Sequence, residues 1–440
     1  MKTRIFNIWE SIRTSLWFIP ALMAVIVSGF AFMLVKIDSS LPSALEIFLF
    51  TGGPEGARTL LSTIAGSMIT IAGVTFSITI VALTLATSQF GPRLLRNFMV
   101  DKFNQLVLGA FIATFVYCLL VLKAIQTFED PVYVPKLAVS FSFILALADL
   151  AILIYFFHHV STAINAEQVI KGVYKELTGT IGRLFNEQDE YPIPQKGIKG
   201  PLPDFQKDST LVYSSACGYL RAIDSEGLFR LAVQDNLVIQ LKYRPGDYVF
   251  TGTPLAAVIP EKEEGSETES KIRNLFLLGS SRSPEQDIEF AIHQLVEIAL
   301  RALSPGINDP YTAISCINRL GDAICQLNSK KFPSPRRYDK EGHLRLVLDV
   351  FTYQGVLDAA FNQIRQSAAG SVAVYIRLLE TLEVIAQSIQ NKDQYQAVKR
   401  HSDMIYRTSK ASIKEDEDLK DIDNRFEAIL KALPVSDEPN

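Results

Sequence analysis

The residue of greatest chemical interest is Asp149, near the middle of the apolar run FSFILALADLAILIYFFHH, residues 141–159. If this run crosses a bilayer, a charged carboxylate at mid-depth costs at least about 3 kcal/mol. No Lys, Arg or His falls in the middle of any long apolar run, so hydroxyl groups or water are the expected partners. Asp149 is then either a neutral, hydrogen-bonded carboxyl between helices or a site that handles protons or cations.

A second polar feature is a stripe of small and hydroxyl-bearing residues in the run TIAGSMITIAGVTFSITIVALTLATSQFGPR, residues 63–93. Spacings of three, four or seven place its members on one face of a helix: Gly66, Thr70, Gly73, Ser77, Thr84 and Ser88. One interpretation is close helix packing, with the hydroxyls bonding across the interface or back to their own helix. The other is a helix that lines a polar pathway in an oligomer.

Four apolar runs approach the length of about 20 residues that crosses a hydrocarbon core. They cover residues 15–35, 63–86, 106–122 and 138–157. The first run is too long for a signal-peptide core and is expected to remain as an anchor. The sequence therefore predicts a four-span α-helical membrane domain, residues 1–159.

Basic residues set the expected orientation of these spans. They gather before the first run and in the interval after the second: Lys2, Arg4, Arg13, Arg93, Arg96 and Lys102. By the positive-inside bias, both termini are cytoplasmic and the protein is a multi-pass protein of the bacterial inner membrane. Arg93 and Arg96 are then placed to meet lipid phosphates or other anions.

Two histidines end the fourth run, His158 and His159. At the cytoplasmic edge of a span they can reach toward the interface or cap the helix C-terminus. A pH sensor is the sharper alternative, because histidine changes charge near neutral pH.

Composition separates the chain into two parts. Up to residue 157 there are ten Lys and Arg against eight Asp and Glu, whereas the remaining 283 residues carry 33 and 39 in an ordinary soluble mixture. Neither part has the basic excess that nucleic-acid binding requires, so nucleic acid is not an expected partner. The four cysteines form no CxxC pair, which is typical of a reducing compartment.

The soluble part is expected to be a cytoplasmic α+β region. Residues 160–210 hold an amphipathic helix and the Pro/Gly linker YPIPQKGIKGPLPD, and residues 211–260 read as short strands of a small β-barrel or sandwich. Residues 271–434 should form a mainly helical domain with four helices after residue 355, and 435–440 a disordered tail. The strands KIRNLFLLG (271–279) and HLRLVLDVFTY (343–353) are expected to pair with each other.

A ligand pocket can be drawn around the predicted helix within residues 284–303. Glu289, His293, Glu297 and Arg301 lie four apart along one face. Residues before and after this helix extend the candidate set, which is Asp287, His293, Arg301, Asn308 and Asp309. The alternative is a set of charge pairs and a capped junction, with Asp309 as N-cap and Pro310 in the first turn of the next helix.

No catalytic signature accompanies these residues. The sequence has no G-x-x-x-x-G-K-[ST], HExxH or GxSxG motif, so neither an enzyme nor a resident metal is expected. The run YRPGDYVFTGTPLAAV (243–258) resembles the closing strands of biotinyl- and lipoyl-type barrel-sandwich hybrids. It lacks their lysine-bearing hairpin tip, so the resemblance implies the shape and no covalent cofactor.

A second resemblance covers nearly the whole chain. DIEFAIHQLVEIALRALSPGINDPYTA, GVTFSITIVALTLATSQFGPRLLRNF and YFFHHVSTAINAE closely resemble the bacterial predicted-membrane-protein family catalogued as domain of unknown function 2254. The resemblance implies an inner-membrane protein with this layout and supplies no activity.

Two functional hypotheses remain. The preferred one is a homo-oligomeric, channel-like pathway for an ion or small solute, with a cytoplasmic domain that assembles or gates it. The alternative is a non-conducting membrane sensor or scaffold whose cytoplasmic domain binds a ligand or partner.

Overall fold

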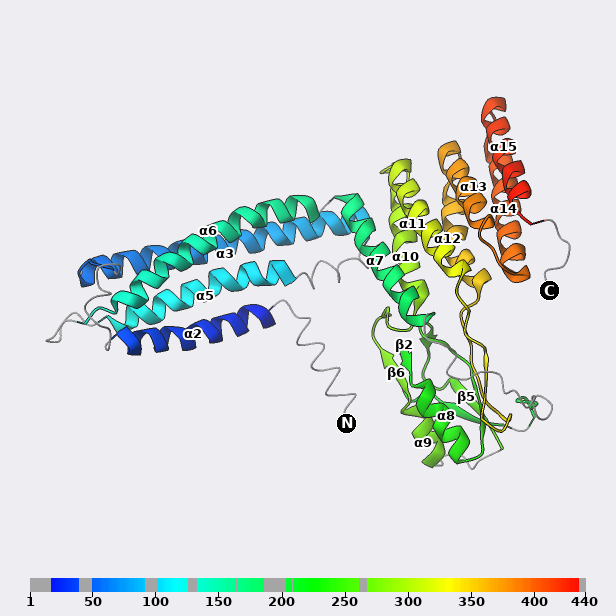
Figure 1. Ribbon diagram of the computed structural model, residues 1–440, viewed down its shortest axis with the longest axis horizontal. Coiled ribbons are helices and arrows are strands. Elements are labelled where there is room, and N and C mark those ends of the chain that lie inside the picture. Colours follow the sequence, from blue (N-terminus) through cyan, green and yellow to red (C-terminus); the bar gives the residue numbers. More distant parts are fainter. Residues whose placement is uncertain are drawn as a thin grey trace. The chain divides into compact units, whose positions relative to one another are not determined.

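The computed structural model describes residues 17–38, 50–91, 102–125, 133–163, 165–185, 203–207, 209–260 and 267–434. The chain divides into two compact units, Met1–Gln168 (unit 1) and Val169–Asn440 (unit 2) (Figure 1). The expected disordered tail and the interfacial Arg93 and Arg96 lie outside the described residues.

Unit 1 contains four described helices that are long and apolar enough to cross a membrane. They are α2 (Phe18–Asp38), α3 (Pro54–Phe90), α5 (Lys102–Ala124) and α6 (Lys136–Ala163). The prediction of four spans is confirmed at this level of length and composition. The second helix is longer than expected, because Pro54 fits its first turn and the helix runs on until Gly91, which has a φ of 110°.

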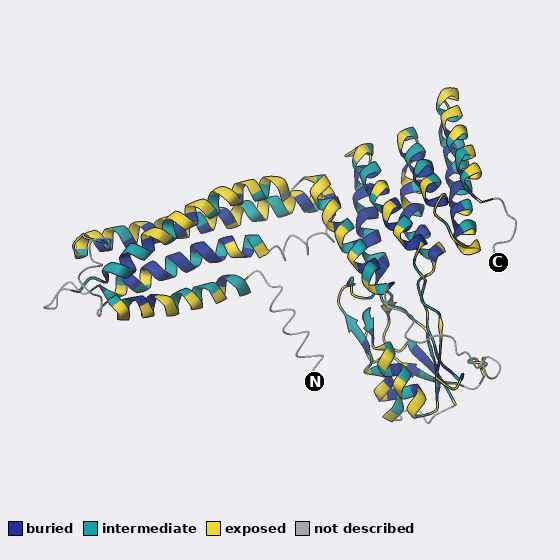
Figure 2. Ribbon diagram, in the orientation of Figure 1, coloured by how far each residue is buried: buried dark blue, intermediate teal, exposed yellow. Residues whose placement is uncertain are grey.

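Helix α5 is the central helix of unit 1. In its most apolar stretch 56% of the residues are buried, against 17% in α2 and α3 and 22% in α6. Val107, Phe111 and Tyr117 of α5 are fully buried in the core of the bundle. The other three helices have long exposed faces (Figure 2). Many of the exposed residues are large and apolar, such as Phe32, Phe76 and Leu147, as in helices that contact lipid.

Unit 2 contains two β-sheets. The five-stranded sheet has the order β1-β5-β3-β8-β7, formed by Thr210–Tyr213, Pro254–Ile259, Val238–Leu241, Leu344–Val347 and Arg336–Tyr338. The three-stranded sheet has the order β4-β2-β6, formed by Tyr248–Val249, Gly218–Ile223 and Phe276–Gly279. All pairs are antiparallel except β3 with β8, which is parallel.

The expected pairing of residues 271–279 with 343–353 is wrong. Residues 267–273 form the short helix α9 (Glu267–Arg273), and β6, which follows it, pairs with β2. Strand β8 instead lies between β3 and β7 in the other sheet. Strands on both sides of residue 260 therefore build each sheet. The barrel form of 211–260 stays a prediction.

A helix also interrupts the segment that was expected to hold strands alone. Helix α8 spans Ser225–Gln234, and Asp224 caps it by accepting a hydrogen bond from the Gly227 amide. Leu228 and Ala232 lie four residues apart on the inner face of this helix and are fully buried. The core they join includes β-strand residues such as Ile239 and Leu346.

Helices make up the remainder of unit 2. They are α7 (Ala166–Leu184), α10 (Ile288–Ala302), α11 (Pro310–Asn328), α12 (Tyr353–Ser367), α13 (Val372–Ala386), α14 (Lys392–Ser412) and α15 (Asp416–Ala432). The four helices after residue 355 are confirmed, with α12 beginning two residues earlier than expected. Helix α10 packs against α11 and α12, α12 against α14, and α13 against α11, α14 and α15.

Candidate functional sites

Asp149 is buried inside the unit 1 bundle, with an exposed fraction of 3%. It lies on α6, and the Thr114 hydroxyl on α5 is a hydrogen-bond partner of its carboxyl group. The other carboxyl oxygen, Oδ2, makes no hydrogen bond within the part of the chain that the structure describes. A buried polar atom without a partner costs about 1–3 kcal/mol. Asp149 is therefore a half-satisfied group at mid-span.

Other polar groups are buried in the same bundle. The Cys118 thiol, one turn beyond Thr114 on α5, interacts electrostatically with Asp149. Thr75 of α3 is 3% exposed, and its hydroxyl has no partner among the described residues. The inner face of α3 thus contributes a further polar atom to the core of the bundle.

The predicted stripe on α3 lies on a different face from Thr75. Thr70, Ser77, Thr84 and Ser88 are all exposed in the single chain. The hydroxyls of Thr70 and Thr84 donate to the carbonyls of Gly66 and Ile80, at 2.8 and 2.9 Å, and that of Ser88 donates to Leu85 at 2.8 Å. The chain therefore does not bring the stripe and the buried Asp149 together. It presents two separate polar features.

The two histidines at the end of α6 have different surroundings. His159 packs its ring against Phe103 of α5, with centroids 4.7 Å apart, whereas His158 is exposed. The Thr162 hydroxyl donates to the carbonyls of both, at 2.9 and 3.1 Å. His159 thus helps to hold α6 against α5.

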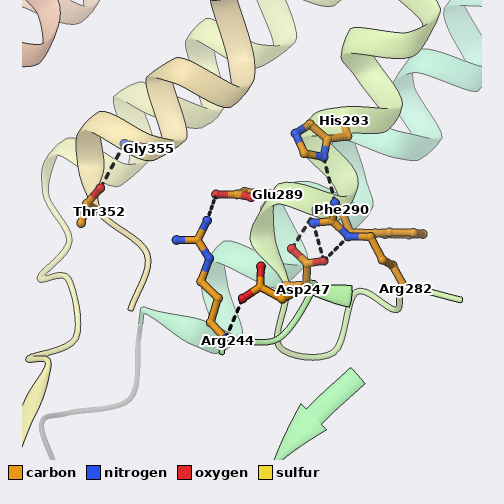
Figure 3. Close-up of polar contacts among 9 residues, drawn as sticks. Arg244, Asp247, Arg282, Glu289, Phe290, His293, Thr352 and Gly355 are labelled. Atoms are coloured by element: carbon orange, nitrogen blue, oxygen red, sulfur yellow. Dashed lines mark hydrogen bonds and ion pairs between the residues drawn. The ribbon is translucent and has the colours of Figure 1, made fainter. Parts of the chain in front are cut away.

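In unit 2, two arginines bind the carboxylates at the start of α10 (Figure 3). Both Nε and Nη2 of Arg282 lie 2.7 Å from Oδ2 of Asp287. The other carboxyl oxygen of Asp287 caps α10 by accepting the Phe290 amide at 3.1 Å. Arg282 also lies 3.2 Å from Nδ1 of His293, so Asp287 and His293 share one partner.

The second arginine, Arg244, follows β3 in the chain. Its Nη2 donates to Glu289 at 2.8 Å, and its guanidinium group lies 4.7 Å from the centre of the Phe351 ring. Burial raises the pKa of Glu289 and that of Asp287, and the neighbouring arginines oppose this effect. The arrangement is a partly buried ion network that joins β3 to α10.

Gly246 allows the turn after β3 to approach this network. Its φ is 103°, and a Cβ atom there would lie 2.5 Å from Oδ2 of Asp287 and 2.9 Å from Arg282. No side chain fits at that distance. The turn and the ion pair therefore pack directly against each other.

The rest of the predicted pocket lies at the opposite end of α10, about 20 Å away for a helix of 15 residues. There Arg301 pairs with Glu297 at 3.8 Å, and Asn308 has a left-handed backbone with a φ of 48°. Asp309 caps α11 by accepting from the amide and hydroxyl of Thr312, which lowers its pKa. The five predicted residues do not converge on one pocket.

The structure contains a cavity that the sequence did not indicate. It has a volume of about 830 Å³ and is lined by the end of α7, the loop after α11, β7 and the segment that follows β8. Its lining residues run from Arg183 to Phe351 in the sequence, and no local motif joins them. Within the described ranges, no group of three or more His, Cys, Asp and Glu residues could hold a metal ion.

These features define a membrane protein with four apolar helices, a mixed α/β region and a helical C-terminal part. The family model described as "Predicted membrane protein (DUF2254)" matches residues 13–384, and the chain belongs to this family. An uncharacterized protein of Mycobacterium bovis and one of Mycobacterium tuberculosis are each 30% identical over 424 residues, which cover 95% of this chain and 80% of the relative. No solved structure matches the chain.

Proposed function

We propose that the protein is an oligomer of the bacterial inner membrane in which α3 lines a route for cations or small solutes. Unit 2 assembles and gates this route from the cytoplasm. The observation that supports the proposal is the stripe of small and hydroxyl-bearing residues on α3, because no other helix of the described chain covers it.

The small residues of the stripe favour contact with another helix over contact with lipid. A Cβ atom added at Gly66 or Gly73 would meet nothing within 4 Å in the single chain. Helices in lipid associate through such small residues, since lipid tails provide no hydrophobic drive between them. A second copy of α3 is a suitable occupant of this face.

The hydroxyl geometry favours cations over anions. Thr70, Thr84 and Ser88 donate their hydrogens to carbonyls of their own helix, so they turn acceptor lone pairs outward. Oxygen lone pairs replace the water around a cation, as the carbonyls of cation filters do. Asp149, buried on a neighbouring helix, adds a titratable group to the same unit.

The cytoplasmic orientation rests on the Lys and Arg bias of the short intervals. Cys217 is exposed in unit 2, whereas Cys118 and Cys316 are buried. A membrane-impermeant maleimide should therefore label Cys217 in inside-out vesicles and leave it unlabelled in intact cells. Labelling of Cys217 from the periplasm would reverse the orientation.

The function is tested by current through the purified protein in planar bilayers. The parent should run as an oligomer in mild detergent and conduct cations, and Thr84→Val should lower the conductance because it removes an outward acceptor. Gly73→Leu should disrupt the oligomer and the current, because the added side chain overlaps only with another chain. Gly29→Leu on α2 is the matched control, since this exposed glycine also has open space around it.

A monomeric parent without current would remove this function and leave the alternative, a sensor or scaffold that does not conduct. One observation favours that alternative, namely the large cavity in unit 2. A scaffold of this kind would bind its ligand with no change in membrane conductance.

A further inference from the structure

The cavity in unit 2 is lined by both polar and apolar residues from strands, helix ends and loops. Its volume of about 830 Å³ falls within the range of about 300–1,000 Å³ that small-molecule sites occupy. The ends of α7 and β3, the loop after α11 and the segment after β8 all reach it, so residues from distant parts of one compact unit line the cavity.

Positive charge dominates the polar part of this cavity. Five basic side chains line it, namely Arg183, Lys330, Lys331, Arg336 and Arg337. Only two acids join them, and one of these, Glu285, already lies 3.9 Å from Arg221. Lys331 and Arg336 are exposed and form no ion pair with any described carboxylate. The cavity therefore has cationic groups available for an anion.

Hydrogen bonds orient two of the arginines. Arg183 donates to the carbonyl of Pro284 and to the Thr180 hydroxyl, each at 3.2 Å, and Arg337 donates to the Ser225 hydroxyl at 3.2 Å. Each of these contacts uses one terminal nitrogen of the guanidinium group. These contacts hold both guanidinium groups at the lining of the cavity.

Apolar side chains also line the cavity. Phe185 lines it and is held by an edge-to-face contact with Phe332, with ring centroids 4.9 Å apart. Phe351 also lines it, and the Arg244 guanidinium lies 4.7 Å from the centre of that ring. Leu241 and Leu348 complete this surface. A ligand that fills the site needs a ring or apolar body in addition to its negative charge.

We propose that this cavity binds a nucleotide, with the phosphates on its basic side chains and the base among its apolar ones. The site is independent of whether the membrane unit conducts, so it goes beyond the function proposed above. A free phosphate satisfies only the basic side chains, and a nucleoside only the apolar ones. Both sets of side chains must contribute to affinity.

The test is isothermal titration of the purified full-length protein in detergent, using ADP, GDP and UDP as probes, with adenosine and inorganic phosphate as fragments. At least one diphosphate should bind at least tenfold more tightly than either fragment. Lys331→Glu and Arg336→Glu should each weaken that binding at least tenfold, and binding should fall with added salt. Arg230→Glu is the control, because this side chain is 70% exposed and lies outside the cavity.

All three variants should keep the thermal unfolding temperature of the parent, which separates lost binding from lost folding. Absence of binding by all three diphosphates at millimolar concentration would overturn the proposal. So would phosphate or adenosine binding as tightly as the diphosphates, or affinity that is equal in the parent and in both cavity variants.

Discussion

Two buried carboxyl groups, one in each unit, are nearly equal in burial and very different in their partners. Asp149 in unit 1 is 3% exposed and Asp287 in unit 2 is 1% exposed. Oδ2 of Asp287 pairs with two nitrogens of Arg282, and Oδ1 accepts a hydrogen bond from the Phe290 amide, so both oxygens have partners. Asp149 has a hydroxyl partner, and its Oδ2 has none within the described chain.

The difference separates a structural carboxylate from one that remains open to a further partner. A buried carboxylate with a cation on one side and a helix N-terminus on the other has partners for both oxygens, which offset part of the cost of its burial. A carboxyl group that retains an unpaired oxygen in a low-dielectric bundle gains from any proton, cation or neighbouring chain that reaches it. The two acids should therefore respond in opposite ways to substitution.

The largest effect is expected from Arg282→Met. It leaves Asp287 buried without its cation, which typically costs about 3–5 kcal/mol of unfolding free energy. Denaturant unfolding of the full chain, followed by circular dichroism, measures this loss. Arg230→Met should change stability by no more than about 0.5 kcal/mol, because Arg230 is mostly exposed. Equal losses in the two variants would show that Asp287 does not depend on its arginine.

Next in size is the acid sensitivity of a third buried group, His401. Burial lowers the pKa of His401 to about 4, despite the opposing charge of Asp358. The unfolded value is about 6.5, so the unfolded chain takes up the proton first as the pH falls. Protonation of His401 in the unfolded chain thus lowers the unfolding free energy progressively between about pH 6.5 and 4, by about 3 kcal/mol in total. Unfolding at several pH values measures how steeply the unfolding free energy falls as the pH is lowered. The fall should be shallower in His401→Gln. An unchanged fall would show that other groups cause it.

A smaller effect is expected at Gly246, which packs directly against Asp287. Gly246→Ala should cost about 2 kcal/mol or more, because the left-handed backbone is strained by any side chain and the new Cβ also strikes the Arg282–Asp287 pair. Gly252→Ala is the matched control. It has a φ of 79° with nothing within 4 Å of an added Cβ, so only the backbone strain of about 1 kcal/mol applies. Thermal unfolding measures the loss of stability in both variants. A larger loss in Gly246→Ala would show that the Arg282–Asp287 pair leaves no room for a side chain, and equal losses would contradict this.

The smallest change in stability is expected at Asp149. Asp149→Asn keeps the shape and hydrogen-bonding capacity of the side chain and should fold as the parent does, whereas Asp149→Leu should lose about 1 kcal/mol with the Thr114 contact. If Asp149 serves a cation or proton, the Asn variant also removes the titratable charge, and the pH dependence of any flux should disappear. A pH-dependent flux that is identical in the parent and the Asn variant would make Asp149 a packing residue.

Local patterns in the sequence predicted much of this fold. Hydropathy located the four apolar helices, and Asp309 followed by Pro310 correctly marked the start of α11. Helix α8 had a similar signal in Asp224 and the buried pair Leu228 and Ala232, but the neighbouring strands obscured it. These features depend on residues within one or two turns of each other.

Features that depend on distant residues could not be predicted in this way. The parallel pairing of β3 with β8 joins segments about one hundred residues apart, so neither strand carries a sign of its partner. Asp287 and His293 were selected from their helix, but Arg282 and Arg244, which bind that cluster, were not. The basic cavity was missed for the same reason, since its charges come from segments that only the tertiary fold brings together.

The length of α3 limits where its hydroxyls can meet lipid. Its 37 residues extend about 55 Å, whereas a hydrocarbon core of about 30 Å holds about 26 helical residues even at a tilt of 40°. About ten residues must therefore stand in the headgroup layer or in water. Glu55 and Arg58 place the first turn at one membrane surface, so the surplus falls at the other end, with Thr84 and Ser88. These two hydroxyls then lie in the headgroup layer or in water, and only the half of the stripe from Gly66 to Ser77 faces lipid in the single chain.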